Sequence, residues 1–141
     1  GYKNFMKRVE KSELLRKNII VAESSSDHNF VSHIVAASNF LVMPSLTEGF
    51  GFAAAEAASV GIPVIATKET SLEEVLDEKN AIFIRPRNSG DIANAIDILA
   101  RNKNLRNKLS RGEKFRTWNE VAHDYVKVYQ DIIRKHKEAR R

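Results

Sequence analysis

Short apolar runs alternate with amphipathic stretches along most of this chain. The apolar runs are NIIVA (18–22), NFLVMP (39–44), GIPVIAT (61–67) and NAIFI (80–84). They are rich in β-branched residues and are bounded by turn-forming residues, as is typical of buried strands. Strands that are apolar on both faces and alternate with helices predict a parallel α/β sheet.

The stretches between and after these runs have the apolar spacing of helices. We predict helices over 2–16, 28–38, from about 52, over 70–77, 89–102 and 104–116, and from 118 to the end. Asp27 is placed to cap the second of them, and Thr70 or Ser71 to cap the fourth. In the last helix, Val121, Tyr125, Val128 and Ile132 form one apolar stripe, and the opposite face is charged.

The candidate chemistry lies in the Glu-Gly-Phe-Gly sequence at 48–51, between a predicted strand and the helix that begins near Phe52. In a parallel α/β sheet, ligands bind beyond the carboxyl ends of the strands, where loops lead into helices. Glycines allow a ligand to approach the backbone, and free amides at a helix start attract an anion such as phosphate. The carboxylates of Glu48 and Glu56 can each accept hydrogen bonds from two neighbouring hydroxyls, so the stretch suits a nucleotide sugar.

The composition limits the classes of function. With 141 residues and 43% hydrophobic content, the chain fits one domain over 1–141. It has no cysteine, which excludes disulfides, zinc knuckles and thiol nucleophiles and favours a reducing cytoplasm. No apolar run approaches the roughly eighteen residues that a membrane span needs. The four histidines lack the spacing of metal ligands, so we assign none of them to a metal site.

Charge is segregated along the chain, with a net charge of +4 over residues 1–17, −7 over 18–100 and +8 over 101–141. A nucleic-acid-binding protein concentrates its basic residues on the binding element, with aromatic residues among them. Here the cations lie in the terminal helices, so we expect no nucleic-acid partner. The basic C-terminal end is suited at most to weak contact with anionic headgroups at the cytoplasmic side of a membrane.

One continuous motif resembles a known family. The segment PSLTEGFGFAAAEAASVGIPVIAT (44–67), followed by SLEEVL (71–76), AIFIRP (81–86) and a tryptophan before the last helix, is similar to the C-terminal nucleotide-sugar-binding domain of family 4 retaining glycosyltransferases, also called glycosyl transferases group 1. The resemblance covers about 19–129. The eight-residue separation of Glu48 and Glu56 matches the paired glutamates of that family. The implied architecture is a Rossmann-like, doubly wound parallel sheet, an incomplete C-terminal half of a GT-B fold that ends in long helices.

The resemblance also implies roles for single residues. Glu48 would hold hydroxyls of the donor hexose and is the candidate catalytic residue. The backbone of Gly49–Gly51 would meet the sugar and the diphosphate, and Glu56 would hold the ribose hydroxyls. Phe50 and Phe52 would mostly support the loop. The implied reaction is hexose transfer with retention, in which the acceptor hydroxyl attacks on the face that the nucleotide leaves. It implies no metal, no protein nucleophile and no cofactor other than the nucleotide-diphospho-sugar donor substrate.

The chain departs from the family in lacking two opening strands, which carry an Arg and a Lys for the diphosphate. We therefore interpret 1–141 as a truncated donor-binding domain that is inactive alone and whose partner is a missing N-terminal acceptor domain. In the doubly wound order, the two strands separate 18–22 from 39–43, 62–66 and 80–84, which predicts a gap in the sheet. The stripe of the last helix should then be partly exposed, including Tyr125, Tyr129 and Ile132.

Three alternatives remain open at this point. The two glutamates can be solvent-exposed acids without a ligand, one in a loop and one near a helix start. The domain can be a catalytically inactive half that serves as a regulatory or interaction module. It can also belong to a nucleotide-sugar epimerase of the same GT-B architecture, although the spacing of Glu48 and Glu56 argues against that reading.

Overall fold

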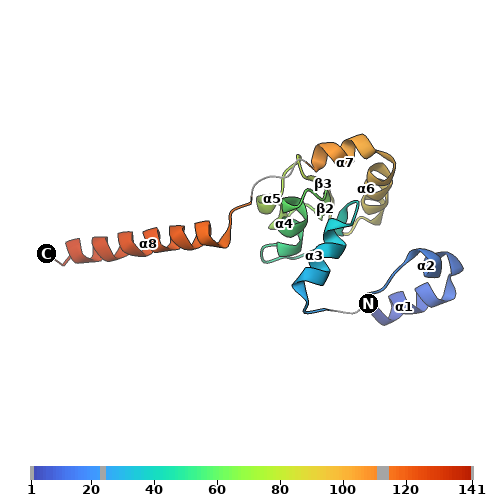
Figure 1. Cartoon of the computed structure of the whole chain (residues 1–141), viewed down its shortest axis with the longest axis horizontal. Helices are drawn as coiled ribbons and strands as arrows, with labels where there is room; N and C mark the ends of the chain where they lie inside the picture. The colour runs from blue at the N-terminus through green and yellow to red at the C-terminus, as the bar shows by residue number, and fades with distance from the viewer. Residues whose placement is uncertain (1, 23–24, 111–114, 141) are drawn as a thin grey trace. The chain divides into compact units, whose positions relative to one another are not determined.

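The computed structural model describes residues 2–22, 25–110 and 115–140. The chain divides into two compact units, Gly1–Ser32 and His33–Arg141. Helices α1 (Tyr2–Lys11) and α2 (Glu13–Asn18) belong to the first unit, and α3 (His28–Ala36) crosses the boundary (Figure 1). All of the strands in the described ranges lie in the second unit.

The first unit differs from the prediction of one helix over 2–16, because two helices meet at Ser12. Ser12 has an extended backbone, and its Oγ accepts a hydrogen bond of 3.3 Å from the amide of Leu15. A serine side chain competes for backbone donors and so favours a helix start over a helix interior. The predicted N-cap of α3 is confirmed, since Asp27 Oδ1 accepts from the amide of Asn29 at 2.9 Å.

The predicted strand over 18–22 is wrong. Asn18 ends α2, and residues 19–22 have no regular secondary structure. The side chain of Ile20 is 96% exposed. β-branched residues favour a strand only where neighbouring strands hydrogen-bond its backbone N–H and C=O groups and other elements cover its side chains. None of the described strands pairs with this segment, so neither condition is met.

The second unit is built on a three-stranded parallel sheet with the order β1-β2-β3. The strands are β1 (Leu41–Met43), β2 (Val64–Thr67) and β3 (Ala81–Ile84). Leu41 pairs with Val64, and Val64 pairs with Ala81. These strands lie within three of the four predicted apolar runs, and their order is the predicted one. All four residues of the central strand β2 are buried.

Helices cover both faces of this sheet (Figure 1). On one face, α4 (Phe52–Ser59) and α5 (Leu72–Val75) pack against Val64 and Ala66 of β2. On the other face, α6 (Ser89–Arg101) and α7 (Lys103–Leu109) pack against Ile65. Successive residues of a strand point to opposite faces, so β2 contributes to both cores. The predicted Rossmann-like α/β class is confirmed.

The alanines of α4 bring this helix close to the sheet. Ala54 and Ala57 are fully buried, and Ala58 is 1% exposed. Their small side chains allow the backbone of α4 to approach β1 and β2. α4 contacts both of these strands and also α5. The alanine-rich sequence is therefore explained by packing, as well as by its high helix propensity.

The C-terminal helices are shorter than predicted. α7 ends at Leu109, and Phe115 and Arg116 are not helical, while residues 111–114 of the helix predicted over 104–116 lie outside the described residues. α8 (Trp118–Glu138) begins with a capping box in which Thr117 and Glu120 bond each other's amides. None of the described helices is long and apolar enough to cross a membrane.

No residue of α8 is buried. The apolar side chains Tyr125, Tyr129 and Ile132 are 59%, 59% and 58% exposed. The prediction that part of this stripe is exposed is confirmed, and the exposed part includes all three of these residues. α8 thus presents a wide apolar face that the described chain does not cover.

An ion pair ties the end of β3 to the start of α6. The Arg85 guanidinium donates two hydrogen bonds to the carboxylate of Asp91, at 2.7 and 2.8 Å, and the Arg85 amide donates a third at 3.2 Å. Asp91 lies in the first turn of α6, which Asn88 caps. The hydrogen bonds from Arg85 lower the pKa of Asp91 from its usual 3.8 to about 2.

This shift predicts an acid-dependent contribution to stability. Because the pKa of Asp91 is lower in the folded chain, ionised Asp91 stabilises the fold fully above pH 3.8, and this contribution is lost as the pH falls towards about 2. The free energy of unfolding should therefore differ between wild type and Asp91→Asn by a constant amount above about pH 4, and by less as the pH falls further. Urea unfolding at a series of pH values measures this difference.

Two arginine variants provide the comparison. Arg85→Gln should weaken the acid response as Asp91→Asn does, because it removes the donor that lowers the pKa of Asp91. Arg87→Gln removes the same charge two residues further on and should leave the acid response unchanged. Identical acid responses in wild type and Asp91→Asn would show that the ion pair does not stabilise the fold in this pH range.

Candidate functional site

The carboxyl ends of the three strands lie at one edge of the sheet, since the strands are parallel. The loop at 44–51 follows β1, the loop at 68–71 follows β2, and the loop at 85–88 follows β3. The first of these loops contains Glu48, Gly49, Phe50 and Gly51, and it leads into α4, which carries Phe52 and Glu56. All six residues predicted from the sequence therefore belong to one loop–helix segment at this edge.

Gly51 is required by the fold. It is the N-cap of α4 and has a left-handed backbone, with φ 88° and ψ 46°. A Cβ atom at this position would lie 2.4 Å from Cδ2 of Leu72, a side chain that is fully buried. Both the backbone angle and the contact exclude a larger residue, so a structural role explains Gly51 without a ligand.

Gly49 is different, because a Cβ atom at this position would have no neighbour within 4 Å. The glycines with positive φ among the described residues are Gly51 and Gly61, so Gly49 does not need a left-handed backbone. Packing within the described chain therefore does not explain why this position is a glycine. Open space over an exposed backbone amide is what close approach of a ligand requires.

The loop after β1 is braced by the loop after β2. The Ser71 hydroxyl donates a hydrogen bond of 3.0 Å to the backbone carbonyl of Glu48. Glu48 is half-buried, and its carboxylate makes no hydrogen bond or ion pair with any other described residue. The backbone at Glu48 is thus fixed while its carboxylate is left available for a ligand.

The start of α4 lacks a side-chain cap. Among the described helices, α2, α3, α5, α6, α7 and α8 each have an amide in the first turn that donates to a side-chain oxygen. The accepting residues are Ser12, Asp27, Thr70, Asn88, Asn102 and Thr117. Of the two caps predicted for α5, the structure thus shows Thr70. Gly51 has no side chain to fill this role at α4, although its carbonyl accepts from the amides of Ala54 and Ala55 at 3.0 and 3.1 Å. The amides of Phe52 and Ala53 donate to no acceptor in the described part of the chain. They form a positively polarised helix end beside Glu48 and Gly49.

Glu56 lies one turn further along α4, on its exposed side. The Ser59 hydroxyl donates to the backbone carbonyl of Glu56 at 2.7 Å, while the carboxylate of Glu56 bonds no other described residue. The site thus combines two available carboxylates with two free backbone amides. These groups suit a ligand that has both hydroxyls and an anionic group.

Three aromatic rings lie next to one another beside this loop. The ring centroids of Phe50 and Phe52 are 4.8 Å apart, and those of Phe52 and Trp118 are 5.8 Å apart. We call Phe50, Phe52 and Trp118 the aromatic row. The sequence predicted that the two phenylalanines support the loop, but it gave no sign of the contact with Trp118, which is distant along the chain.

Sequence reasoning also missed a cation at the same edge. Lys68 follows directly on β2, and its amide donates to the carbonyl of Ile84 at 2.9 Å. The charge of Lys68 also contributes to lowering the pKa of Asp91. Its place immediately after a buried strand was the signal that could have identified it.

Comparison with known proteins identifies the family. The model of the family described as "Glycosyl transferases group 1" matches residues 1–115, so this chain belongs to the group 1 glycosyltransferases. The chain is 31% identical over 136 residues to an uncharacterized glycosyltransferase of Methanocaldococcus jannaschii, covering 93% of this chain and 38% of that protein. It is 32% identical over 111 residues to a D-inositol 3-phosphate glycosyltransferase of Stackebrandtia nassauensis, covering 74% of this chain and 25% of that protein.

A solved structure supports the assignment of the fold. The crystal structure of the C-terminal domain of a glycosyl transferase group 1 family protein from Francisella tularensis superposes with a TM-score of 0.69 at 31% identity. The alignment covers 79% of this chain and 57% of that one. The chain therefore has the architecture of a GT-B glycosyltransferase C-terminal domain. It spans 38% or less of the length of the two curated relatives named above.

The two loop glycines should respond differently to the same substitution. Gly51→Ala should destabilise the fold by about 2–4 kcal/mol, because it combines a strained left-handed backbone with overpacking against Leu72. Gly49→Ala should change the free energy of unfolding by no more than about 0.5 kcal/mol. Urea unfolding measures both. Equal losses in the two variants would mean that the fold, and not a ligand, requires glycine at 49.

Proposed function

We propose that this domain binds a nucleoside-diphospho-sugar donor for a retaining hexosyltransferase. The observation that carries the proposal is the uncapped start of α4 beside Glu48 and Gly49. A helix N-terminus with free amides favours a phosphate group, and the two available carboxylates favour sugar hydroxyls. Membership of the group 1 glycosyltransferases supports the transfer reaction.

The proposed roles follow from the positions of the groups. The amides of Phe52 and Ala53 and the open backbone at Gly49 would contact the diphosphate. Glu48, held by the bond from Ser71 to its carbonyl, would bind hydroxyls of the transferred hexose. Glu56 would bind the two hydroxyls of the ribose through its exposed carboxylate.

In the proposed reaction, the acceptor hydroxyl attacks the anomeric carbon on the face from which the diphosphate departs. The bond between the anomeric carbon and the phosphate oxygen breaks, and a phosphate oxygen takes the proton of the acceptor. Positioning of the donor and stabilisation of charge then supply most of the rate enhancement, with no metal and no protein nucleophile. The amides at the start of α4 stabilise the charge that develops on the leaving diphosphate.

A second domain should complete the enzyme. The chain spans 25% of the D-inositol 3-phosphate glycosyltransferase relative, and no residue of α8 is buried. We infer that the apolar face of α8 packs on an acceptor-binding domain, as the resemblance to GT-B enzymes implies, and that the chain alone binds its donor weakly and does not catalyse transfer. A phosphorylated polyol is the first acceptor to assay, because the relative is named for one.

The two glutamates should have separable effects on binding and turnover. Glu56→Gln should weaken nucleoside diphosphate binding roughly ten- to a hundredfold, the value of one charge-assisted hydrogen bond, because the ribose is present in both donor and product. Glu48→Gln should instead reduce mainly kcat, because the transferred hexose changes most in the transition state. Calorimetric titration of nucleoside diphosphates measures the first effect, and kinetics with the acceptor-binding domain present measure the second.

A matched control exists on the neighbouring helix. Glu74→Gln makes the same change at an exposed position of α5 and should alter neither binding nor turnover. If Glu56→Gln leaves the affinity for every nucleoside diphosphate within about twofold of wild type, the ribose assignment is wrong. Unimpaired donor binding combined with an absence of transfer in the complete protein would favour the regulatory-module alternative.

The apolar face of α8 gives a test of the missing domain. Ile132→Asp should abolish association with the acceptor-binding domain, because it places a charge in an apolar interface. Gln130→Asp adds the same charge on the polar side of α8 and should leave association intact. Analytical ultracentrifugation of the two separately expressed domains distinguishes these outcomes. Equal association of both variants would mean that α8 does not form this interface.

A further inference from the structure

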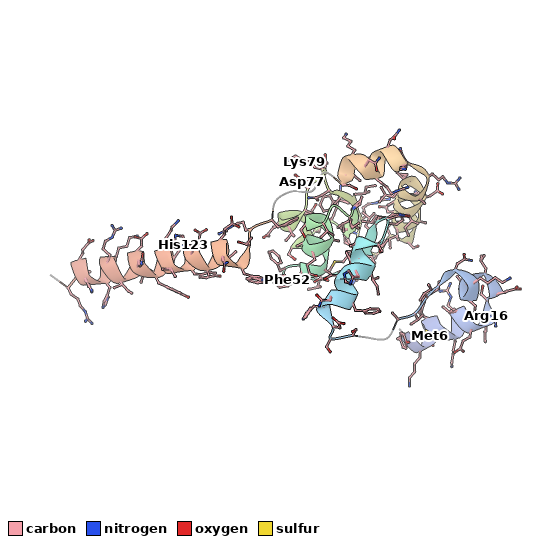
Figure 2. The ribbon with its side chains drawn as sticks, in the orientation of Figure 1. Met6, Arg16, Phe52, Asp77, Lys79 and His123 are labelled. Atoms are coloured by element: carbon pink, nitrogen blue, oxygen red, sulfur yellow. The ribbon has the colours of Figure 1, made fainter. Side chains whose placement is uncertain are left out.

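The aromatic row connects the last helix of the chain to the candidate donor loop. Figure 2 shows the Phe52 side chain at the start of α4, near the beginning of α8. Phe50 lies within the loop between its two glycines, Phe52 is the first residue of α4, and Trp118 is the first residue of α8. The two ring contacts therefore lead from α8 through Phe52 to the loop that carries Glu48 and Gly49.

The three rings lack the burial of ordinary core residues. Phe50, Phe52 and Trp118 are 48%, 53% and 73% exposed. The Phe50 ring contacts the Phe52 ring, and the Phe52 ring contacts Trp118, so the rings shield one another from water in the absence of deeper packing. Trp118 contacts Phe52 directly and is linked to Phe50 only through Phe52.

The start of α8 is itself well defined. Thr117 and Glu120 form the capping box, and Arg116 pairs with Asp124, eight residues further along the chain. These bonds fix the backbone that carries Trp118, so movement of α8 moves the indole as well. Two contacts hold the loop backbone on either side of Gly49–Phe50. The Ser71 hydroxyl bonds the Glu48 carbonyl before this stretch, and Gly51 packs against Leu72 after it. The part of the loop that the aromatic row can position is therefore Gly49–Phe50.

We propose that Trp118 is a positioning residue for the donor loop, acting through Phe52 and Phe50. The indole holds the first turn of α4 and the Gly49–Phe50 backbone in the arrangement that receives the donor. This inference rests on the proposed function in that the loop binds the nucleotide sugar. A further consequence is that the position of α8 and the affinity for the donor are coupled. When the acceptor-binding domain covers the apolar face of α8, it would also fix Trp118 and so strengthen donor binding.

The positioning role has a test that needs no ligand. The amides of Ala54 and Ala55, which bond to the Gly51 carbonyl, report on the first turn of α4. Trp118→Leu should speed hydrogen exchange at these two amides roughly three- to tenfold, the effect expected for loss of one aromatic pair. Trp118→Phe should retain most of the protection. Val128→Ala, which removes an exposed apolar side chain elsewhere on α8, should have no effect. Wild-type exchange in Trp118→Leu would overturn the proposal.

A second test uses the fact that Trp118 is the only tryptophan of the chain. Addition of a nucleoside diphosphate should change its fluorescence with the affinity that calorimetry measures, and Phe52→Leu should abolish the change. Trp118→Leu should weaken nucleoside diphosphate binding roughly three- to tenfold. One outcome separates the two proposals. If Glu56→Gln weakens nucleoside diphosphate binding, while the nucleotide leaves Trp118 fluorescence unchanged and Trp118→Leu binds it as tightly as wild type, the proposed function stands and the positioning role fails. If no nucleoside diphosphate binds at all, the proposed function fails, and the exchange experiment alone decides the positioning role.

Discussion

The close approach of Gly51 to Leu72 is the constraint on which the candidate site depends. The Leu72 side chain occupies the space where a Cβ atom at 51 would lie, so the residue before α4 is a glycine with a left-handed backbone. A glycine cannot cap the helix with a side chain, and the amides of Phe52 and Ala53 are left without an acceptor among the described residues. The same packing brings the two loops together, so that Ser71 reaches the carbonyl of Glu48. One steric requirement of the core thus produces both the shape and the polarity of the site.

The two glycines of the loop illustrate how folding and binding share a short sequence. Gly51 is explained by packing alone, whereas Gly49 has open space around it and is explained by no contact in the described chain. The two glutamates show a similar division, since their backbone carbonyls are bonded by Ser71 and Ser59 while their carboxylates are left free. The backbone of the segment is held by the fold, and two carboxylates and two backbone amides remain available for a ligand.

Two kinds of element were predicted correctly, the strands buried within the chain and the long exposed helix α8, whose amphipathic spacing needs no covering partner to be recognised. β1, β2 and β3 were predicted correctly because their buried neighbours enforce the apolar pattern. The segment at 18–22 has the same composition but no pairing partner, and a propensity scale does not detect a missing partner. The break at Ser12 was missed because a single capping hydrogen bond outweighed the helical spacing on both sides of it.

The candidate site was predictable where it is continuous in sequence and unpredictable where it is not. The segment from Glu48 to Glu56 could be identified from its spacing and from its resemblance to a family. The bond from Ser71 and the contact of Trp118 with Phe52 join residues far apart in the chain, and neither has a local signal. The first contact holds the backbone of the loop, and the second joins α8 to the start of α4. What the sequence missed is therefore the support of the candidate site, while the ligand roles predicted for Glu48 and Glu56 stay predictions.

The most direct test of the account is a crystal structure of the protein with a bound nucleoside diphosphate. The account predicts that the phosphates lie at the start of α4, within hydrogen-bond distance of the amides of Phe52 or Ala53, and that the ribose hydroxyls donate to the carboxylate of Glu56. A nucleotide bound elsewhere, or bound at this edge with its ribose out of reach of Glu56, would contradict the account.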